Sequence, residues 1–166
     1  ILSRMGAHQV IGVDPLEYRL GWSRRMGATR TVNPTEEDIA AVVEELTDGA
    51  GADVVVEAAG HPEALNLSFN LVRPLGRVVL FGLQSDTVVP LEHRLIMRKQ
   101  PVIVPTTGAS SGDPTTHIER MVALRKRGWA DPGQLVTHCL PFEQVQRAFD
   151  MYEAQDDQVI KVVMSL

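Results

Sequence analysis

The sequence predicts an α/β protein built on a doubly wound parallel sheet. Over the first two-thirds of the 166 residues, short apolar runs alternate with amphipathic stretches, as strands alternate with helices in this class. The runs ADVVVEAAG and GRVVLFGL are almost wholly apolar, which is typical of parallel strands covered by helices on both faces. Because connections between parallel strands are right-handed, such an alternation winds helices onto both sides of the sheet.

The elements are expected in the following order. Ile1, Leu2 and Met5 lie on one face of what resembles the last turns of a helix, with Gly6 as its stop. We expect strands at 9–14, 28–33, 52–60, 76–83, 100–108, 133–140 and 158–164. We expect helices at 17–27, 35–49, 61–72, 90–99, 116–128 and 141–154.

Two helices have a predicted buried stripe. In the helix at 35–49, Thr35 is the expected cap and three acids fill the first turn, where the helix dipole favours negative charge. Its stripe comprises Ile39, Val42, Val43 and Leu46. The stripe expected in the helix at 141–154 comprises Phe142, Val145, Phe149 and Tyr152.

The segment ASSGDPT at 109–115 is rich in small turn residues and predicts a domain boundary. We therefore expect a first domain at 1–106 and a second portion at 107–166. Before this boundary, Pro101 and Pro105 confine the strand at 100–108 to a sheet edge, because proline donates no ladder hydrogen bond.

Composition excludes several classes. A net charge of −5 without a basic stripe argues against a nucleic-acid partner. No apolar run approaches the roughly 20 residues of a membrane span. A single cysteine, Cys139, excludes an internal disulfide and fits a reducing, cytoplasmic setting. Its neighbour His138 points to the opposite side of an extended segment, so the two do not readily share a metal ion.

Asp14 is the first candidate site residue. It ends the run VIGVD, at the carboxyl end of the second strand of the expected sheet, where such folds bind ligands. A carboxylate there accepts hydrogen bonds from both hydroxyls of an adenosine ribose and repels a 2′-phosphate, so it predicts NAD rather than NADP. Arg19 could also reach the ribose or a phosphate. Aspartate is equally a good turn or capping residue, and this alternative stays open.

Small residues follow the next two strands. Ala58, Ala59 and Gly60 end one strand and Gly82 ends another. Small side chains permit the close backbone approach that a flat nicotinamide ribose needs, although a tight turn alone would also use glycine.

The Gly-rich loop of a dinucleotide site is expected roughly 20 residues before the ribose acid. Counting back from Asp14 passes the first residue of the sequence. We therefore expect the loop, the first strand and most of the first helix to precede the chain, and the sheet to lack its central strand. The neighbouring strands would then carry unpaired backbone groups, so we expect the chain alone to be marginally stable and inactive.

The chain resembles the medium-chain dehydrogenase/reductase family in an ordered set of segments: VIGVDPLEYRLGWSRRMGATRTVNP, GADVVVEAAG, GRVVLFGL, VQRAFDMYE and VIKVVM. More narrowly, the chain resembles the zinc-dependent alcohol, polyol and threonine dehydrogenase branch. The resemblance covers nearly the whole chain. It implies a Rossmann sheet followed by the remnant of a catalytic domain, and hydride transfer between an alcohol and NAD.

The resemblance also implies site residues. Asp14 and Arg19 would hold the adenosine ribose, Thr106 would lie near the nicotinamide amide, and Lys161 would contact the pyrophosphate unless it is a solvated lysine on an edge strand. The residues expected to line the coenzyme cleft are Ala58, Ala59, Phe81, Gly82 and Leu83.

The family's zinc ligands and catalytic residues precede the Gly-rich loop, so the resemblance places none of them here. The histidines that match no ligand position are His8, His61, His93, His117 and His138. The resemblance further implies a small alcohol or polyol substrate and a homo-oligomer, a dimer or tetramer.

Other interpretations remain. Asp14 disfavours a zinc-free NADPH-dependent quinone reductase, because a site that binds a 2′-phosphate is expected to have a small residue and a cation at this position. A methyltransferase is disfavoured by the ending VIKVV, and a short-chain dehydrogenase by the lack of a lysine four residues after Tyr18 or Tyr152. A non-catalytic nucleotide-binding domain is the alternative outside enzymes.

Overall fold

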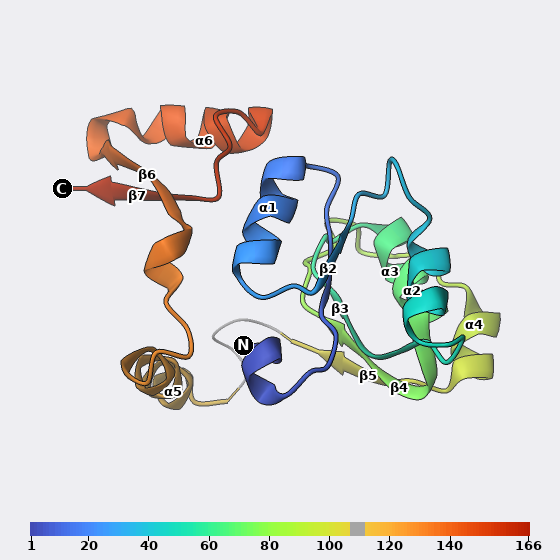
Figure 1. Ribbon diagram of the computed structural model, residues 1–166. Coiled ribbons are helices and arrows are strands. Elements are labelled where there is room, and N and C mark those ends of the chain that lie inside the picture. Colours follow the sequence, from blue (N-terminus) through green and yellow to red (C-terminus); the bar gives the residue numbers. More distant parts are fainter. Residues whose placement is uncertain (107–111) are drawn as a thin grey trace. The chain divides into compact units, whose positions relative to one another are not determined.

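The computed structural model describes residues 1–106 and 112–166 (Figure 1). The chain divides into two compact units, residues 1–36 with 116–166 and residues 37–115, and each is described by itself. The predicted boundary between 106 and 107 touches residues 107–111, which lie outside the described part.

The helices and strands follow the predicted alternation, and all strands except β4 are shorter than expected. β4 is longer and starts at Val72, four residues before the predicted strand. In the first unit they are η1 (Leu2–Met5), β1 (Ile11–Val13), α1 (Glu17–Arg25), β2 (Arg30–Val32), α5 (Pro114–Lys126), η3 (Pro132–Leu135), β6 (Val136–Pro141), η4 (Phe142–Gln144), α6 (Val145–Ala154) and β7 (Lys161–Ser165). In the second they are α2 (Ile39–Leu46), β3 (Ala52–Glu57), α3 (Pro62–Leu71), β4 (Val72–Leu80), α4 (His93–Lys99) and β5 (Val102–Pro105).

The strand pairs are parallel, which confirms the predicted α/β class. In the first unit, β1 pairs with β2 and β6 pairs with β7. In the second, the strand order is β3-β4-β5, so β5 is the predicted edge strand. Within the described residues, β1 and β3 each have one strand neighbour. We expect these two strands to flank a further one, but β2, β5, β6 and β7 also have one neighbour each, so this stays a prediction.

In the first unit, α1 and β2 bury Leu20 and Val32, which are 2% and 0% exposed. The C-terminal elements form a separate layer, in which α6 covers the β6–β7 pair (Figure 1). Its core comprises Leu140, Ala148, Met151 and Val159.

The predicted stripe of α6 is wrong. Phe142 and Phe149 are 55% and 67% exposed, and Val145 and Tyr152 are exposed too. Because residues 142–144 form a 3₁₀ turn with a tighter period, the α-helix starts only at Val145 and presents Ala148 and Met151 to the strands. Tyr152 keeps a role through its hydroxyl, which accepts a hydrogen bond from Val162 N at 3.0 Å.

In the second unit, α3 and α4 pack against the three-stranded sheet (Figure 1). The core there comprises Leu65, Phe69, Val72 and Val78. The expectation that β3 is covered on both faces is wrong. Val55 packs against this core, but Val54 and Val56 point to the opposite face and are each 45% exposed.

The start of α2 also differs from the prediction. Asp38 caps the helix, and its Oδ1 accepts from Ala40 N at 2.8 Å and Ala41 N at 3.4 Å. Thr35 instead belongs to a turn before the helix, where its backbone N–H donates to Asn33 Oδ1 at 3.0 Å. The predicted buried positions Ile39, Val42 and Val43 are confirmed, while Leu46, the fourth member of the predicted stripe, is half-buried.

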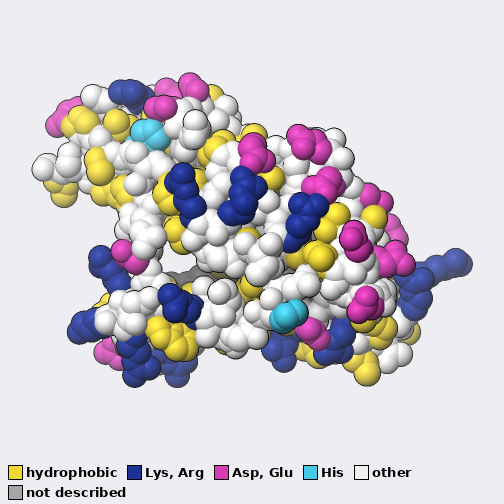
Figure 2. Space-filling model, viewed as in Figure 1, with side chains coloured by type: hydrophobic (Ala, Val, Ile, Leu, Met, Phe, Trp, Pro, Cys, Tyr) yellow, Lys and Arg dark blue, Asp and Glu magenta, His cyan; other side chains and the backbone are white. Residues whose placement is uncertain are grey.

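The stop of the N-terminal turn is confirmed, since Gly6 follows η1 with φ of 91°. On the face shown in Figure 2, basic and acidic side chains are interspersed. A search of the described helices finds none with the length and apolar character needed to cross a membrane.

Candidate coenzyme-binding site

The carboxyl end of β1 carries Asp14 in the first unit. Its backbone N–H continues the ladder to β2 by donating to Val32 O at 3.3 Å. Its Oδ1 accepts from Leu16 N at 2.9 Å, which closes a turn before α1. Its Oδ2 lies 3.7 Å from Arg19 Nη1. One carboxylate oxygen therefore orders the turn, while the other makes only a long ion pair.

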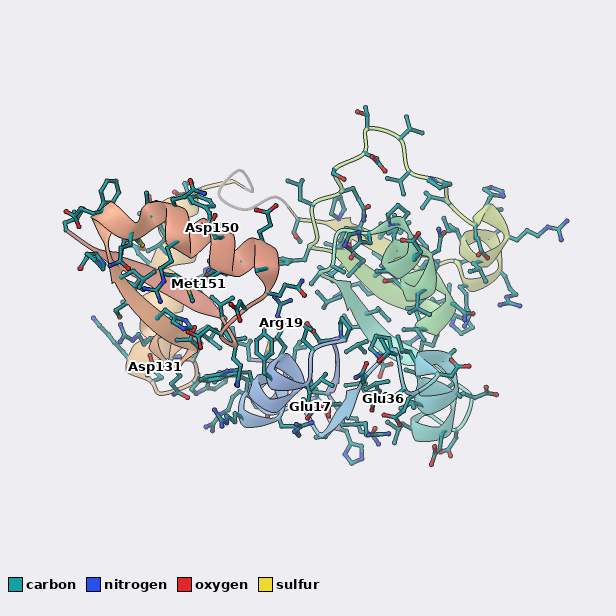
Figure 3. The ribbon with its side chains drawn as sticks, turned by 90° about the horizontal axis from the view of Figure 1, so that it is seen from above. Glu17, Arg19, Glu36, Asp131, Asp150 and Met151 are labelled. Atoms are coloured by element: carbon teal, nitrogen blue, oxygen red, sulfur yellow. The ribbon has the colours of Figure 1, made fainter. Side chains whose placement is uncertain are left out.

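Arg19 projects from the first turns of α1 (Figure 3). Its guanidinium lies 5.7 Å from the centre of the Tyr18 ring, and its Nε donates to Tyr18 Oη at 3.3 Å. Tyr18 in turn donates to Val159 O at 3.3 Å, within the same unit. The side chains of Asp14 and Arg19 are 26% and 34% exposed, so both remain accessible to a ligand.

In the second unit, two turns at the carboxyl ends of β3 and β4 lie against each other. A side chain on Gly60 would place its Cβ 2.5 Å from Leu83 O, and Gly60 has φ of +72°. A Cβ on Gly82 would collide with the backbone of Gly60. Both positions therefore exclude a side chain by close contact, and Gly60 also needs the left-handed backbone that glycine adopts freely.

The predicted cleft residues on these turns are exposed. Ala58 and Ala59 follow β3, and both are accessible to solvent. Phe81 and Leu83 flank Gly82 and are 68% and 91% exposed. The turns thus present small residues and two large apolar side chains to solvent, which suits a flat, partly apolar ligand.

Thr106 follows β5, where its backbone N–H and its Oγ1 both donate to Leu80 O, at 2.9 and 2.8 Å. Thr106 is therefore hydrogen-bonded to the last residue of β4 and lies next to the turn that follows it. Lys161, at the start of β7 in the first unit, has an exposed side chain. Its backbone N–H donates to Thr137 Oγ1 at 3.3 Å.

The structure therefore gathers six predicted residues at the strand ends of the second unit: Ala58, Ala59, Phe81, Gly82, Leu83 and Thr106. The first unit carries Asp14, Arg19 and Lys161.

Two open hollows lie elsewhere. One of about 490 Å³ in the first unit includes Asp150 and Met151 of α6 (Figure 3). The other, of about 300 Å³ in the second unit, includes Glu44 and Lys99. Neither of these two hollows is lined by a predicted coenzyme-binding residue.

Sequence reasoning missed Glu57, the last residue of β3. It is 3% exposed, and its Oε1 accepts from Ala59 N and Gly60 N at 2.8 and 2.7 Å. The sequence feature that could have identified Glu57 is that it is the single acid inside the apolar run VVVEAAG, because a buried strand does not by itself require an acid.

The metal implied by the resemblance does not fit this part of the chain. Within residues 1–106 and 112–166, no group of three or more His, Cys, Asp or Glu side chains is placed to hold an ion. His138 has other partners, Thr137 Oγ1 at 2.9 Å and Asp157 Oδ2 at 3.1 Å.

Comparison with known families decides the assignment. Residues 1–124 match the family model described as zinc-binding dehydrogenase. The chain belongs to this family. An L-threonine 3-dehydrogenase from Caldanaerobacter subterraneus is 30% identical over 153 residues, which cover 91% of this chain and 43% of that protein. The chain thus spans less than half the length of this zinc-binding dehydrogenase relative.

Solved structures agree in fold. The benzyl alcohol dehydrogenase of Acinetobacter calcoaceticus is 25% identical, with a TM-score of 0.86 over 99% of this chain and 44% of that one. A protein described as a short chain alcohol dehydrogenase from Escherichia coli, solved with NADH, is 22% identical with a TM-score of 0.84 over 99% of this chain and 47% of that one. The second likeness shows the fold alone.

Proposed function

We propose that this chain is the coenzyme-binding part of an NAD-dependent, zinc-type alcohol dehydrogenase. The observation that carries the proposal is the placement of Asp14 at the carboxyl end of β1, with Oδ2 engaged only in a 3.7 Å ion pair. A weak, partly exposed pair is readily exchanged for ligand hydroxyls. The ribose hydroxyls of NAD are donors of the right kind.

The same carboxylate sets the coenzyme preference. A 2′-phosphate beside Asp14 would bring two negative groups together, which costs free energy. Arg19 offsets this cost only in part, because its guanidinium also serves Tyr18. NAD is therefore the proposed coenzyme, and the NADPH-dependent quinone reductase is the disfavoured alternative.

The turns after β3 and β4 are the proposed contact for the nicotinamide half. Gly60 and Gly82 keep the backbone free of side chains, and Phe81 and Leu83 offer apolar surface. When bound, NAD accepts a hydride at its nicotinamide ring. The chain's own residues would hold and orient that ring. Lys161 is proposed to contact the pyrophosphate and Thr106 the nicotinamide amide.

The substrate is proposed to be a small alcohol, polyol or amino alcohol, in keeping with the threonine dehydrogenase and benzyl alcohol dehydrogenase relatives. Zinc ligands and catalytic residues would lie outside the residues described here. The domain division at 106/107, the dimer or tetramer and the cytoplasmic setting also stay proposals.

The test uses the natural full-length protein. It is supplied with NAD or NADP and a panel of primary alcohols, polyols and L-threonine, and formation of the reduced coenzyme is followed by absorbance. We expect turnover with NAD and at least one substrate, and its loss on treatment with a zinc chelator. Coenzyme binding without turnover would favour the non-catalytic nucleotide-binding domain. NADP-linked turnover that survives the chelator would favour the quinone reductase.

A further inference from the structure

Glu57 is a buried acid whose carboxylate is held by backbone groups. Its Oε1 accepts from two successive N–H groups, Ala59 N at 2.8 Å and Gly60 N at 2.7 Å. Hydrogen bonds to an ionised acceptor are roughly twice as strong as neutral ones. Successive N–H groups that converge on one oxygen form a small anion-binding concavity, so the turn 58–60 is shaped around this carboxylate.

The same residue also holds the second turn. The carbonyl oxygen of Glu57 accepts from Phe81 N and Gly82 N, both at 2.8 Å. A Cβ on Gly82 would lie 2.7 Å from Glu57 Oε2, so the carboxylate packs directly against that glycine. Glu57 therefore bonds to the turn 58–60 through its side chain and to the turn 81–83 through its backbone.

Gln84 adds a further link between the turns. When its amide is assigned in the orientation that satisfies both neighbours, its nitrogen donates to Gly60 O and its oxygen accepts from His61 N, both at 3.2 Å. In this orientation Gln84 bridges from beyond β4 to the turn after β3. This link involves only backbone atoms of the partner turn, as the Glu57 bonds do. Hydrogen bonds of Glu57 and Gln84 thus join the two turns, beside the direct contact of Gly60 with Gly82 and Leu83.

We propose that Glu57 is a positioning residue that fixes the turns 58–60 and 81–83 as one platform for the nicotinamide half of the coenzyme. The inference rests on the proposed function, which assigns that half to these turns. Glu57 does not itself touch the ligand. Its buried Oε1 is occupied by two donors, and the surface that it orders is made by the exposed residues Ala58, Phe81 and Leu83.

The test compares three variants of the full-length protein. Glu57→Met fills a similar volume but accepts no strong hydrogen bond, and Glu57→Gln restores a neutral acceptor. Glu63→Gln is the matched control, because Glu63 is an exposed acid at the start of α3 in the same unit. Binding of NADH and of AMP is measured by calorimetry. AMP serves as a probe of the adenosine half alone.

We expect Glu57→Met to weaken NADH binding about 10-fold, since freed turns must be ordered again at binding. AMP binding should change less than about 2-fold, and Glu57→Gln should recover NADH binding to within about 3-fold. Equal weakening of NADH and AMP, or unchanged NADH binding by Glu57→Met, would overturn the inference and leave the proposed function intact.

Amide hydrogen exchange at Ala59 and Gly60 provides a second measurement, which applies also where Glu57→Met does not fold. Exchange should be faster in Glu57→Gln than in the wild type at these two amides and unchanged at Val55. Unchanged exchange at all three would overturn the inference. If the wild type binds neither NADH nor AMP, the proposed function fails, and the inference about the nicotinamide platform fails with it.

Discussion

Oδ2 of Asp14 lies 3.7 Å from Nη1 of Arg19, while Oδ1 of the same carboxylate accepts from Leu16 N at 2.9 Å. The two roles suggested for Asp14, turn residue and ribose ligand, are therefore not exclusive. One oxygen orders the turn that leads into α1, and the other faces a cation that is itself partly exposed. Asparagine can keep the first role and lose the charge needed for the second.

Asp14→Asn is expected to weaken NADH binding about 10-fold, because a charge-assisted hydrogen bond to the ribose is replaced by a weaker neutral one. NADPH binding should weaken less or improve, since the repulsion of its 2′-phosphate is removed. Both affinities are measured by fluorescence titration of the full-length protein. Glu17→Gln is the control, because Glu17 pairs with Arg24 in solvent on the same helix. An unchanged NADH affinity in Asp14→Asn would refute the assignment.

Gly60→Ala is expected to lower the free energy of unfolding by more than about 2 kcal/mol, because a left-handed backbone and a contact with Leu83 O both oppose a Cβ. Gly21→Ala should instead raise it by about 0.5–1 kcal/mol, since Gly21 lies within α1 and its Cβ would meet only Arg24 Nη2 at 3.8 Å. Urea denaturation measures both. Changes of opposite sign in the free energy of unfolding would support the close approach of the turns. Equal stability of Gly60→Ala and the wild type would contradict it.

Asp38→Ala is expected to cost about 1 kcal/mol of stability, because the orphan N–H groups of Ala40 and Ala41 lose their acceptor. Asp38→Asn keeps an acceptor and should cost much less. Thermal melting with circular dichroism detects the difference. A larger loss for Thr35→Ala than for Asp38→Ala would show that the cap lies at the residue first expected from the sequence.

Lys99 predicts a pH dependence. Burial, and then the charge of Arg98, lower the pKa of its ammonium below 10.5, although its Nζ donates to Val72 O at 2.8 Å. Between the lowered pKa and 10.5 the unfolded chain binds more protons than the folded one, so this group adds stability as the pH rises through that window. Lys99→Met should remove this contribution, and Arg98→Gln should reduce it. Urea midpoints measured from neutral pH upward test the trend. A steeper rise in Lys99→Met would contradict it.

The sequence predicted the features that local pattern controls. The apolar spacing of Ile39, Val42 and Val43 identified the buried face of α2, and the prolines around β5 identified an edge strand. The alternation of runs gave the parallel α/β class. The position of one acid, Asp14, directly after an apolar run, predicted a candidate ligand site at the carboxyl end of β1.

Competing hydrogen bonds and tertiary contacts decided the features that the sequence did not predict. Thr35 and Asp38 are both residue types that cap helices well. Thr35 donates a backbone hydrogen bond to Asn33 Oδ1 in the preceding turn, and Asp38 caps α2 instead. The apolar run of β3 does not reveal that Val54 and Val56 face outward. The role of Glu57 rests on hydrogen bonds from Phe81 N and Gly82 N, which lie in the turn after β4, so no spacing within β3 reveals it.

The central claim is that an adenosine ribose without a 2′-phosphate binds at Asp14. The most direct test is the ratio of the dissociation constants of NADH and NADPH, measured by titration of the wild-type full-length protein. We expect NADH to bind at least about 10-fold more tightly, the factor that corresponds to about 1.4 kcal/mol. Equal affinities, tighter binding of NADPH, or no binding of either coenzyme would contradict the claim.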